Sequence, residues 1–588
     1  MRDHRGVSNW GVDGARAAAI FALALALAIP AGASNQKLSP DLTGLTGNAA
    51  TDVIVQYRVP PAIRQQNKVH QHGGTVKGTL PLVNGFVVSI TPGQMKDLVS
   101  EPDVAYISPN RKLAGRLNNS APAVNAPYAW SLGLDGSNIS VAVIDSGIGD
   151  KRTAGFKKSD LNKWNTSSSR VVYGQSFVND GNGTFDAYGH GTHVAGILAG
   201  NGYNSTGSQY TQTFKGMAPN ANLIILRVLD GHGLGTDSAV IAAINTAIVL
   251  KRKYNIRVIN LSLGRPVFES YTLDPLCKAV EAAYKAGIVV VVAAGNEGRE
   301  DSNTTNGYGT ITAPGNDPYV ITVGAMKSMG TPTRADDLIA TYSSKGPTAI
   351  DHVVKPDIVA PGNRVIAVLA APSAAIVTTY PQNVVPLSYY TSNSVNSGSM
   401  SYFTLSGTSM ATPVVSGAAA LLLQAQPKLT PDQVKARLMK TASKVFPTYS
   451  AFTDPTTGVT YTSQYDVFTI GAGYLDIQAA LSSTEVSTGV AKSPAAQYDA
   501  ATDSVYFVKD SSAMWGGSAM WGSSAVWGNN VFVGNQSAMW GSSAMWGSSA
   551  MWGSSSSQAF SAMWGSSAMW GSSTNSAEST NILVNGEN

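Results

Sequence analysis

The sequence predicts an α/β protein with a mostly parallel sheet that helices cover on both faces. Apolar runs typical of buried strands alternate with helical segments through the middle of the chain. The runs are residues 139–144, 223–229, 257–263 and 288–294, and the helical segments are residues 190–198, 237–253 and 273–286. Asp145 directly follows the first run, and Asn296 follows the last. Because catalytic groups gather at the carboxyl ends of parallel strands, we expect an active site at this edge.

Residues 1–33 are predicted to form a secretory signal peptide. Three arginines come before an apolar run at residues 17–29, and the small residues 31–33 fit a cleavage site. The apolar run is shorter than the roughly 20 residues that a helix needs to cross a bilayer. We therefore expect a secreted protein, extracellular or associated with the cell surface, without a transmembrane anchor. An uncleaved anchor is the alternative.

Three segments lie between the signal and the main domain. Residues 34–50 are predicted to be a flexible lead-in, and residues 113–127, rich in Gly, Asn, Ala and Pro, a linker. Between them, residues 51–112 show strand patterns around a short helical stretch, which predicts a small α+β domain. The main α/β domain is expected to span residues 128–485.

The end of the chain differs in composition from everything before it. After a linker at residues 486–510, the hexapeptide Ser-Ala-Met-Trp-Gly-Ser recurs through a tail at residues 511–588, and no charged residue occurs from 511 to 577. A six-residue period does not match a helix, so three interpretations stay open: disorder, stacked β-turn repeats, or an adhesive array of exposed Trp. Many Trp side chains in a region without charged residues favour self-association, or binding to a surface or a glycan.

Charge and cysteine content exclude some partners and sites. The formal net charge of +4 is small for 588 residues, so nothing indicates nucleic acid binding. Cys277 is the only cysteine, which excludes an intrachain disulfide. Because it lies in the helical pattern at residues 273–286, we expect a buried thiol and not a catalytic nucleophile.

Three short motifs carry groups that together suit nucleophilic catalysis. Asp145 lies in Val-Ile-Asp-Ser-Gly, His190 opens His-Gly-Thr-His-Val-Ala-Gly, and Ser409 lies in Ser-Gly-Thr-Ser-Met-Ala-Thr-Pro, within a predicted helix at residues 406–424. A serine hydroxyl needs a nearby base, imidazole has a suitable pKa, and a carboxylate orients the imidazole. The order Asp, His, Ser along the chain is one of the known orders of the serine protease triad.

These motifs resemble the aspartate, histidine and serine signatures of the subtilisin-like serine proteases, the subtilases, over roughly residues 120–485. The segment Ala-Ala-Gly-Asn that ends at Asn296 resembles the oxyanion segment of that family. The resemblance implies that Asp145 orients His190, and that His190 is the general base and then the general acid. It also implies that Ser409 is the nucleophile, with the Asn296 amide and the Ser409 backbone N–H stabilising the oxyanion.

The resemblance further implies a channel for an extended peptide, which would pair as an added strand between two segments of the enzyme. The residues expected to contact the peptide are Ser262, Leu263 and Gly264 on one side, Gly233, Leu234 and Gly235 on the other, and Ala293, Ala294 and Gly295 of the oxyanion segment. By the same resemblance, residues 51–112 would be an inhibitory propeptide that assists folding and is then removed by the enzyme itself.

The sequence leaves metal binding open. His190 and His193 lie one helical turn apart, but no Glu stands between them, so the metalloprotease pattern fails. Asp160 resembles the position of a calcium ligand in the family, whereas the usual calcium-binding loop is replaced here by residues 201–215. The chemistry is expected to need no cofactor, and structural calcium stays undecided. Asp186, in the loop before His190, is expected to face water.

The predicted function is that of a secreted serine endopeptidase, which hydrolyses proteins or peptides through an acyl-enzyme intermediate and matures from a zymogen. The alternative is a non-catalytic surface or matrix protein that acts through the Trp repeats. A third possibility is a protease that binds carbohydrate by stacking Trp rings on sugars.

Overall fold

The structure is a computed structural model of the chain. It describes residues 37–39, 42, 49–110, 112–115, 122–149, 159–301, 305–329, 331–391, 400–454, 457–499, 504–508, 530–532 and 582–587. The predicted signal peptide and nearly all of the Trp repeats lie outside the described residues.

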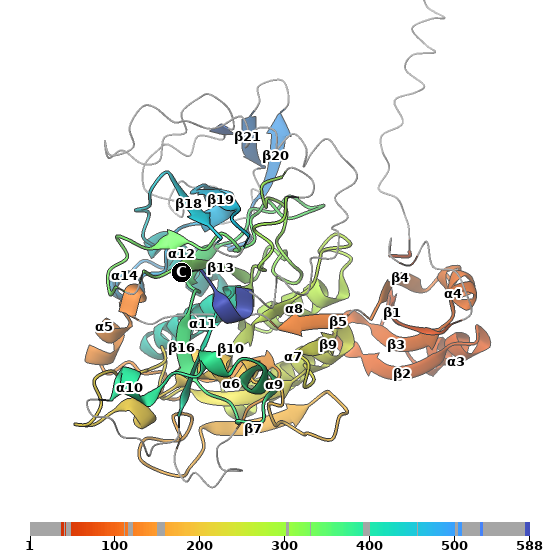
Figure 1. Cartoon of the computed structure of the whole chain (residues 1–588). Coiled ribbons are helices and arrows are strands. Elements are labelled where there is room, and N and C mark those ends of the chain that lie inside the picture. Colours follow the sequence, from red (N-terminus) through yellow and green to blue (C-terminus); the bar gives the residue numbers. More distant parts are fainter. Residues whose placement is uncertain are drawn as a thin grey trace, which may run out of the picture.

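A central sheet of eight strands forms the main domain, in the order β14-β13-β12-β10-β6-β8-β7 with β15 paired to β13 (Figure 1). All of its strand pairs are parallel except β13 with β14. In chain order the strands are β6 (Ser140–Asp145), β7 (Val171–Ser176), β8 (Asn222–Arg227), β10 (Ile256–Leu261), β12 (Val289–Ala293), β13 (Ile321–Lys327), β14 (Leu338–Ile339) and β15 (Ile358–Pro361). The predicted fold class is confirmed, and the four predicted strands are β6, β8, β10 and β12.

Helices cover both faces of this sheet. α6 (His190–Ala199) and α11 (Thr408–Ala425) lie on one face, and α7 (Asp237–Tyr254) and α8 (Pro275–Lys285) lie on the other. Val141 and Val143 of β6 pack with α6 and α11, whereas Ala142 and Ile144 pack with α7 and α8. Successive strand residues point to opposite faces, so a strand buried on both faces is apolar throughout.

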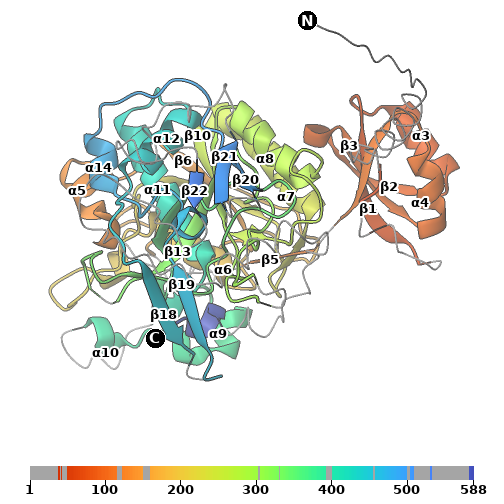
Figure 2. The same cartoon turned by 90° about the horizontal axis from the view of Figure 1, so that it is seen from above.

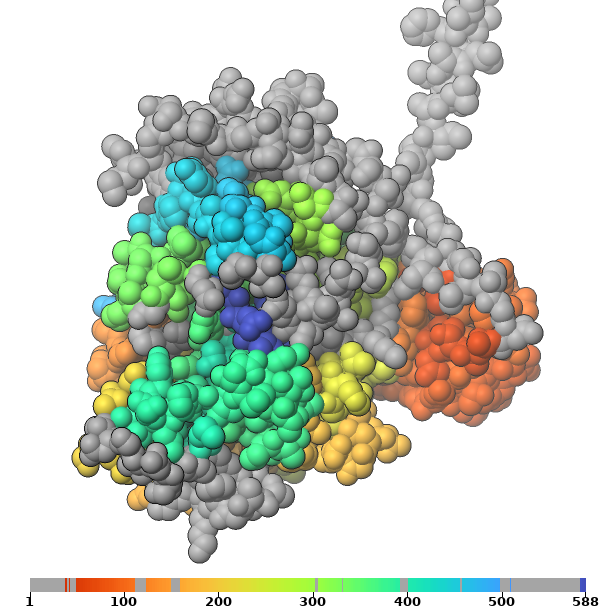
Figure 3. Space-filling model, in the orientation of Figure 1, coloured from red at the N-terminus to blue at the C-terminus, as the bar shows by residue number. Residues whose placement is uncertain are grey.

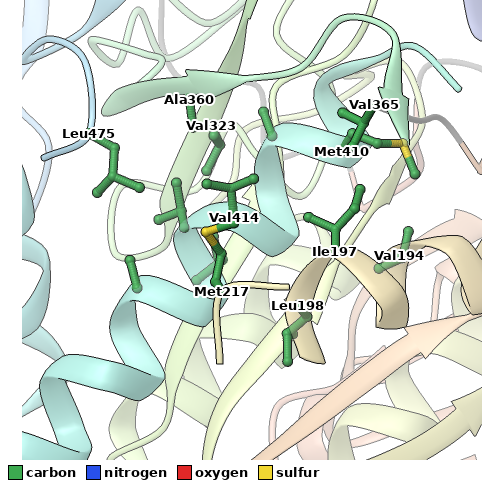
Figure 4. Close-up of a cluster of buried hydrophobic side chains, with 14 of the residues drawn as sticks. Val194, Ile197, Leu198, Met217, Val323, Ala360, Val365, Met410, Val414 and Leu475 are labelled. Carbon is green, nitrogen blue, oxygen red and sulfur yellow. The ribbon is translucent and has the colours of Figure 1, made fainter. Parts of the chain in front are cut away.

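The two helices that carry the predicted base and nucleophile pack against each other. Figure 4 shows the buried cluster between them, with side chains Val194, Ile197 and Leu198 of α6 and Met410 and Val414 of α11. Dense packing of this kind tolerates little displacement, so it holds the two helices in a constant relation. Among the described helices, α11 alone is long and apolar enough to cross a membrane, but 89% of that stretch is buried in the domain.

Residues 51–109 fold as an antiparallel sheet in the order β2-β3-β1-β4 with two helices (Figure 2). The elements are β1 (Thr51–Tyr57), α3 (Ile63–Gln71), β2 (Thr75–Leu80), β3 (Gly85–Ile90), α4 (Pro92–Val99) and β4 (Val104–Pro109). Val53 and Val88 face α3 and α4. Ile54 and Val87, on the opposite face of the sheet, share a buried core with α7 and α8. The small domain therefore covers one side of the main domain.

Three segments predicted to be irregular are paired in the structure. The predicted linker at residues 486–510 contains an antiparallel hairpin of β20 (Ala495–Asp499) and β21 (Ser504–Val508), and the other two segments pair with distant parts of the chain. Part of the predicted linker at residues 113–127 is strand β5 (Lys112–Gly115), which lies between β9 (Leu234–Thr236) and β11 (Leu263–Gly264) and is antiparallel to both. In the predicted lead-in, Leu38 forms a β-bridge with Ile107. Local composition does not reveal the last two pairings because the partners lie far away in the sequence.

Several smaller elements complete the described chain. They are α5 (Ala126–Ser131), β16 (Val365–Val368), α9 (Ala375–Thr379), α10 (Leu387–Tyr390), β17 (Tyr402–Leu405), α12 (Pro431–Thr441), β18 (Tyr449–Thr453), β19 (Thr460–Gln464), α13 (Val467–Ile470), α14 (Ile477–Ser482), β20 (Ala495–Asp499), β21 (Ser504–Val508) and β22 (Asn530–Phe532). The sequence assigns residues 511–588 to a single tail, but residues 582–584 are buried against the main domain. That tail is therefore not wholly separate from the main domain.

Candidate active site

Asp145 and His190 are in direct contact at the carboxyl end of the central sheet. Asp145 is the last residue of β6, and His190 is the first residue of α6. The His190 Nδ1 atom lies 2.5 Å from Asp145 Oδ1, and both side chains are buried. A carboxylate at Nδ1 favours a proton on that nitrogen, which leaves Nε2 able to accept a proton from another group. This is the arrangement of a base with its orienting carboxylate.

Asp186 holds the start of α6 in place. One carboxylate oxygen accepts hydrogen bonds from Ser146 Oγ at 2.8 Å and from Gly189 N at 2.7 Å. The other accepts from Thr192 N at 2.8 Å and from Thr192 Oγ1 at 2.6 Å. The expectation that Asp186 faces water is wrong, because its side chain is fully buried. Its charge lies where the unpaired N–H groups and the dipole of a helix favour an anion.

A glycine allows the start of α6 to approach the loop after β6 closely. A Cβ atom at Gly191 would lie 2.4 Å from Gly147 O and 3.3 Å from Asp145 Cβ. The first distance is far shorter than any van der Waals contact, so a side chain at this position would push His190 away from Asp145. The backbone N–H of Gly191 instead donates to Ser146 Oγ at 2.8 Å.

Ser409 lies in the first turn of α11, where its backbone carbonyl is hydrogen-bonded and its hydroxyl has no partner among the described residues. Its carbonyl oxygen accepts a hydrogen bond from Ser262 Oγ at 2.7 Å. Ser262 Oγ accepts in turn from Asn260 Nδ2 at 3.0 Å, and Asn260 Oδ1 accepts from Ser416 Oγ at 2.8 Å. The Ser409 Oγ atom is buried and has no hydrogen-bond partner among the described residues. The hydroxyl is therefore not part of the network that holds the helix.

The Asn296 side chain is held through its oxygen. Asn296 Oδ1 accepts hydrogen bonds from Thr408 N at 2.9 Å and Thr408 Oγ1 at 3.0 Å. Its Nδ2 atom is buried and has no partner within the described part of the chain. A buried donor without a partner costs free energy, and such donors occur where a site is built to bind an oxygen atom. Because Thr408 precedes Ser409, this donor lies beside the predicted nucleophile.

The two segments predicted to bind a peptide already have a strand between them. On one side of β5, Leu113 pairs with Gly235 and Ala114 with Leu234. On its other side, Ala114 pairs with Gly264 and Gly115 with Leu263. The spacing and direction of β9 and β11 therefore suit one extended chain, which residues 112–115 occupy. Ser262, next to β11, is the residue that bonds the carbonyl of the predicted nucleophile.

The other predicted contacts, Gly233, Ala293, Ala294 and Gly295, are all buried. Ala293 ends β12 and is buried, as is Ala294, while Gly295 N donates to Thr408 Oγ1 at 3.1 Å. Gly233 forms part of the turn before β9, where its N–H donates to Asp230 O at 3.1 Å.

His193 and Cys277 have structural surroundings. The His193 Nε2 atom lies 2.9 Å from Phe403 O, and burial lowers the pKa of His193 to about 3, so the ring is neutral. Cys277 Sγ donates to Asn316 Oδ1 at 3.2 Å, and burial raises the pKa of this thiol. Within the described residues, no group of three or more His, Cys, Asp or Glu side chains is arranged to hold a metal ion.

The sequence profile of the subtilase family matches residues 136–473. The chain belongs to the subtilase family. Serine protease AprX of Bacillus subtilis (strain 168) is 35% identical to this subtilase over 381 residues, which are 63% of this chain and 76% of AprX. Subtilisin E of the same strain is 34% identical over 385 residues, which are 65% of this chain and 81% of subtilisin E. This subtilase is accordingly a subtilisin-like serine endopeptidase.

The fold of this subtilase also resembles a solved structure. The crystal structure of fervidolysin from Fervidobacterium pennivorans, described as a keratinolytic enzyme related to subtilisin, matches it with a TM-score of 0.53. The match covers 77% of this subtilase and 63% of the fervidolysin chain at 21% identity. At that identity the likeness shows a shared fold.

The surroundings of Asp160 in this subtilase do not fit a calcium ion. One Asp160 carboxylate oxygen accepts from Asn204 N at 2.7 Å, and the other accepts from Tyr402 OH at 2.7 Å. The guanidinium of Arg170 is buried beside it and donates to four backbone carbonyls, those of Asp160, Asn162, Ala199 and Ala221. Carbonyl and carboxylate oxygens are the ligands that calcium prefers. Here protein donors already use them, and burial lowers the pKa of Arg170 to about 10, which keeps it charged at neutral pH.

We expect Arg170→Met to destabilise this subtilase by about 2–6 kcal/mol. The methionine fills similar space without donors. The carbonyls of Asp160 and Asn162 keep hydrogen bonds from Asn201, but those of Ala199 and Ala221 lose their Arg170 donor, at a cost of about 1–3 kcal/mol each. Urea unfolding measures the change, in a Ser409→Ala background that prevents self-digestion. Arg257→Met is the matched control, because Arg257 also donates to backbone carbonyls, those of Pro427 and Leu429, but is only half-buried. Equal losses in the two variants would contradict a special role for Arg170.

Proposed function

We propose that this subtilase is a secreted endopeptidase whose catalytic triad is Asp145, His190 and Ser409. The observation that carries the proposal is the buried Asp145–His190 contact of 2.5 Å at the carboxyl end of β6. Two buried polar atoms without partners among the described residues support it, Ser409 Oγ and Asn296 Nδ2. Packing between α6 and α11 supports the pairing of His190 with Ser409.

The proposed chemistry has two halves. His190 Nε2 takes the proton of Ser409 Oγ as this oxygen attacks the carbonyl carbon of the peptide bond. The protonated imidazole, stabilised by Asp145, gives its proton to the leaving amine when the C–N bond breaks, which leaves an acyl-enzyme. Water then attacks the ester with His190 again as the base, and the released acid and free Ser409 complete the cycle.

Asn296 Nδ2 and the backbone N–H of Ser409 would stabilise the negative oxygen of each tetrahedral intermediate. The Ser409 N–H belongs to the first turn of α11, where N–H groups have no partner within the helix. Thr408 keeps the Asn296 nitrogen oriented, because it occupies the oxygen of the same amide. Donors placed before the reaction need no rearrangement when charge develops on the oxygen.

A fluorophosphonate probe tests the proposed nucleophile directly. We expect one adduct per chain, located on the peptide that contains Ser409, and no adduct on the Ser409→Ala protein. Protein unfolded by heat before the probe is added controls for non-specific labelling of serine hydroxyls. A folded protein without an adduct would favour the alternative, a non-catalytic surface or matrix protein that acts through the Trp repeats.

We further propose that residues 51–112 act as a propeptide. Two contacts support this role, the burial of Ile54 and Val87 against α7 and α8 and the pairing of β5 between β9 and β11. An inhibitor that enters the peptide channel blocks substrates and also brings its own chain to the nucleophile. The expected order is folding, self-cleavage behind β5, and then loss of the propeptide.

Export and cofactors complete the proposal. Residues 1–33 would direct secretion and be removed, and N-terminal sequencing of protein from the medium would test this.

The chemistry would use no cofactor, and because Asp160 and Arg170 leave no free ligands, chelation by EDTA should not lower the melting temperature through that site. The tail could still bind a surface, a glycan or another copy, which pull-down with insoluble glycans and with cell envelopes would test.

A further inference from the structure

The last described residues of the chain, 582–587, return to the main domain and bind to it. Leu583 O accepts a hydrogen bond from Ser406 N at 2.8 Å, and Val584 O accepts one from Asn383 Nδ2 at 2.7 Å. Leu583 and Val584 are buried in the same core cluster as α6 and α11. Figure 3 shows the segment in dark blue, in a recess between the cyan surface of β18 and β19 and the green surface around α9 and α10.

Glu587 is bound through both its side chain and its backbone. One carboxylate oxygen accepts from Arg299 Nη2 at 2.9 Å, from Thr341 N at 2.9 Å and from Thr341 Oγ1. Asn363 Oδ1 accepts from Glu587 N at 2.8 Å, and Asn363 Nδ2 donates to Glu587 O at 2.7 Å. Glu587 is only 1% exposed. A buried charge with this many donors lies in a site built for one acidic residue.

The site also requires the glycine before Glu587. Gly586 has a φ of +59°, in the left-handed region that favours glycine. A Cβ atom at Gly586 would lie 2.1 Å from Ser406 Oγ and 2.7 Å from Asn363 Oδ1. The domain thus binds three hydrophobic residues followed by Asn-Gly-Glu.

The chain is attached to the main domain a second time, just before the repeats. Val354 N donates to Pro494 O at 2.8 Å, and Ala496 N donates to His352 O at 2.8 Å. The repeat region, residues 511–577, lies between this attachment and the one at residues 582–587.

We propose that residues 582–587 are a C-terminal latch, an intramolecular peptide ligand of the main domain that closes the Trp-repeat region into a loop attached at both ends. The latch also supports the backbone that leads to Ser409, because it receives the N–H of Ser406. Attachment before the repeats makes binding of the latch intramolecular, which raises its effective concentration, so a short peptide suffices. Binding of the latch does not depend on the proposed roles of the triad residues.

Hydrogen exchange of the full chain measures the latch directly. In a Ser409→Ala background, Gly586→Ala should accelerate exchange of the Ser406 and Glu587 amides about tenfold or more, because both lose their acceptors. Gly133→Ala is the matched control, since Gly133 also has a positive φ, of +73°, but a Cβ there meets nothing within 4 Å. The control should leave both amides unchanged.

The exchange rates of the amides in β6 and β10 distinguish release of the latch from unfolding of the main domain. If they keep their protection while Ser406 exchanges faster, the latch alone has been released. Unchanged exchange at Ser406 in the Gly586→Ala protein would overturn the proposal. So would an equal acceleration in the Gly133→Ala protein.

Carboxypeptidase digestion of Glu587→Gln provides a second, milder test. Glutamine keeps the size of the side chain but removes the charge that Arg299 and Thr341 bind. The parent chain should lose at most Asn588, because residues 582–587 are bound, whereas the variant should be trimmed through the latch at least about tenfold faster. Mass spectrometry follows the masses over time. Trimming of the parent at the rate of the variant would show that the segment is not held.

Discussion

The Ser409→Ala protein should accumulate as a precursor that retains residues 51–112, whereas the parent should yield a shorter mature chain. The last residue of β5, Gly115, pairs with Leu263, and the neighbouring Ser262 donates to the Ser409 carbonyl, so self-cleavage behind β5 would be an intramolecular reaction. Such positioning can lower the barrier by about 7–11 kcal/mol relative to a reaction between separate molecules. Alanine removes the hydroxyl while leaving the packing of α11 almost unchanged. Mass spectrometry of both proteins should place the new N-terminus after Gly115 and before Pro122.

The maturation experiment needs a host without other extracytoplasmic proteases. Ser131→Ala is a suitable control, because Ser131 is an exposed serine at the end of α5 and should not affect processing. Cleavage of the Ser409→Ala precursor at the same bond and rate as the parent would assign the processing to another protease. Such a result would leave the fluorophosphonate test of catalysis untouched.

Asn296→Ala should lower kcat by about 10²–10³-fold, the loss known for removal of an oxyanion donor in subtilisin itself, and leave KM nearly unchanged. The reason for expecting it here is that Asn296 Nδ2 is a buried donor without a partner among the described residues, beside Ser409. A donor that binds only the charged oxygen of the intermediate contributes to kcat and little to substrate binding. Steady-state kinetics on a small peptide substrate measures both constants.

Two further variants distinguish the contribution of the Asn296 N–H donor from that of Thr408, which orients the Asn296 side chain. Asn296→Asp keeps an acceptor for Thr408 but loses the N–H donor, so its kcat should fall about as far as that of Asn296→Ala. Thr408→Val removes the hydrogen bonds that Thr408 Oγ1 makes with Asn296 Oδ1 and Gly295 N and keeps the donor, so we expect a loss of about tenfold, smaller than that of Asn296→Ala. A fall of less than about threefold in Asn296→Ala would remove Asn296 from the mechanism.

Local patterns were sufficient to predict four of the eight strands of the central sheet and to name the triad candidates. β6, β8, β10 and β12 are buried on both faces, and such strands are continuous apolar runs that stand out in any sequence. Asp145 and Asn296 were placed because a polar residue directly after such a run lies at the carboxyl edge of the sheet. His190 and Ser409 each lie at the start of a helix with a recognisable pattern. In all these cases the information lies within a few neighbouring residues.

Two of the features that local patterns missed depend on partners far away in the sequence. β5 is a strand because β9 and β11 lie on either side of it, although its own composition is that of a linker. Asp186 is buried because Ser146 and the start of α6 surround its carboxylate with donors. Neither the pairing nor the burial leaves a periodic signal in the sequence.

The sequence by itself predicted the fold class, because hydrophobic periodicity is a local property, and its motifs named Asp145, His190 and Ser409 as candidates for the chemistry. Tertiary structure alone decided which polar groups are already satisfied. Beside Asp160 it placed the guanidinium of Arg170, which binds carbonyl oxygens that a metal ion would otherwise need as ligands. It also brought Gly586 and Glu587 into contact with Ser406 and Asn363. The physical reason is that burying a charge or a backbone group requires a partner, and the fold alone determines which distant residue supplies it.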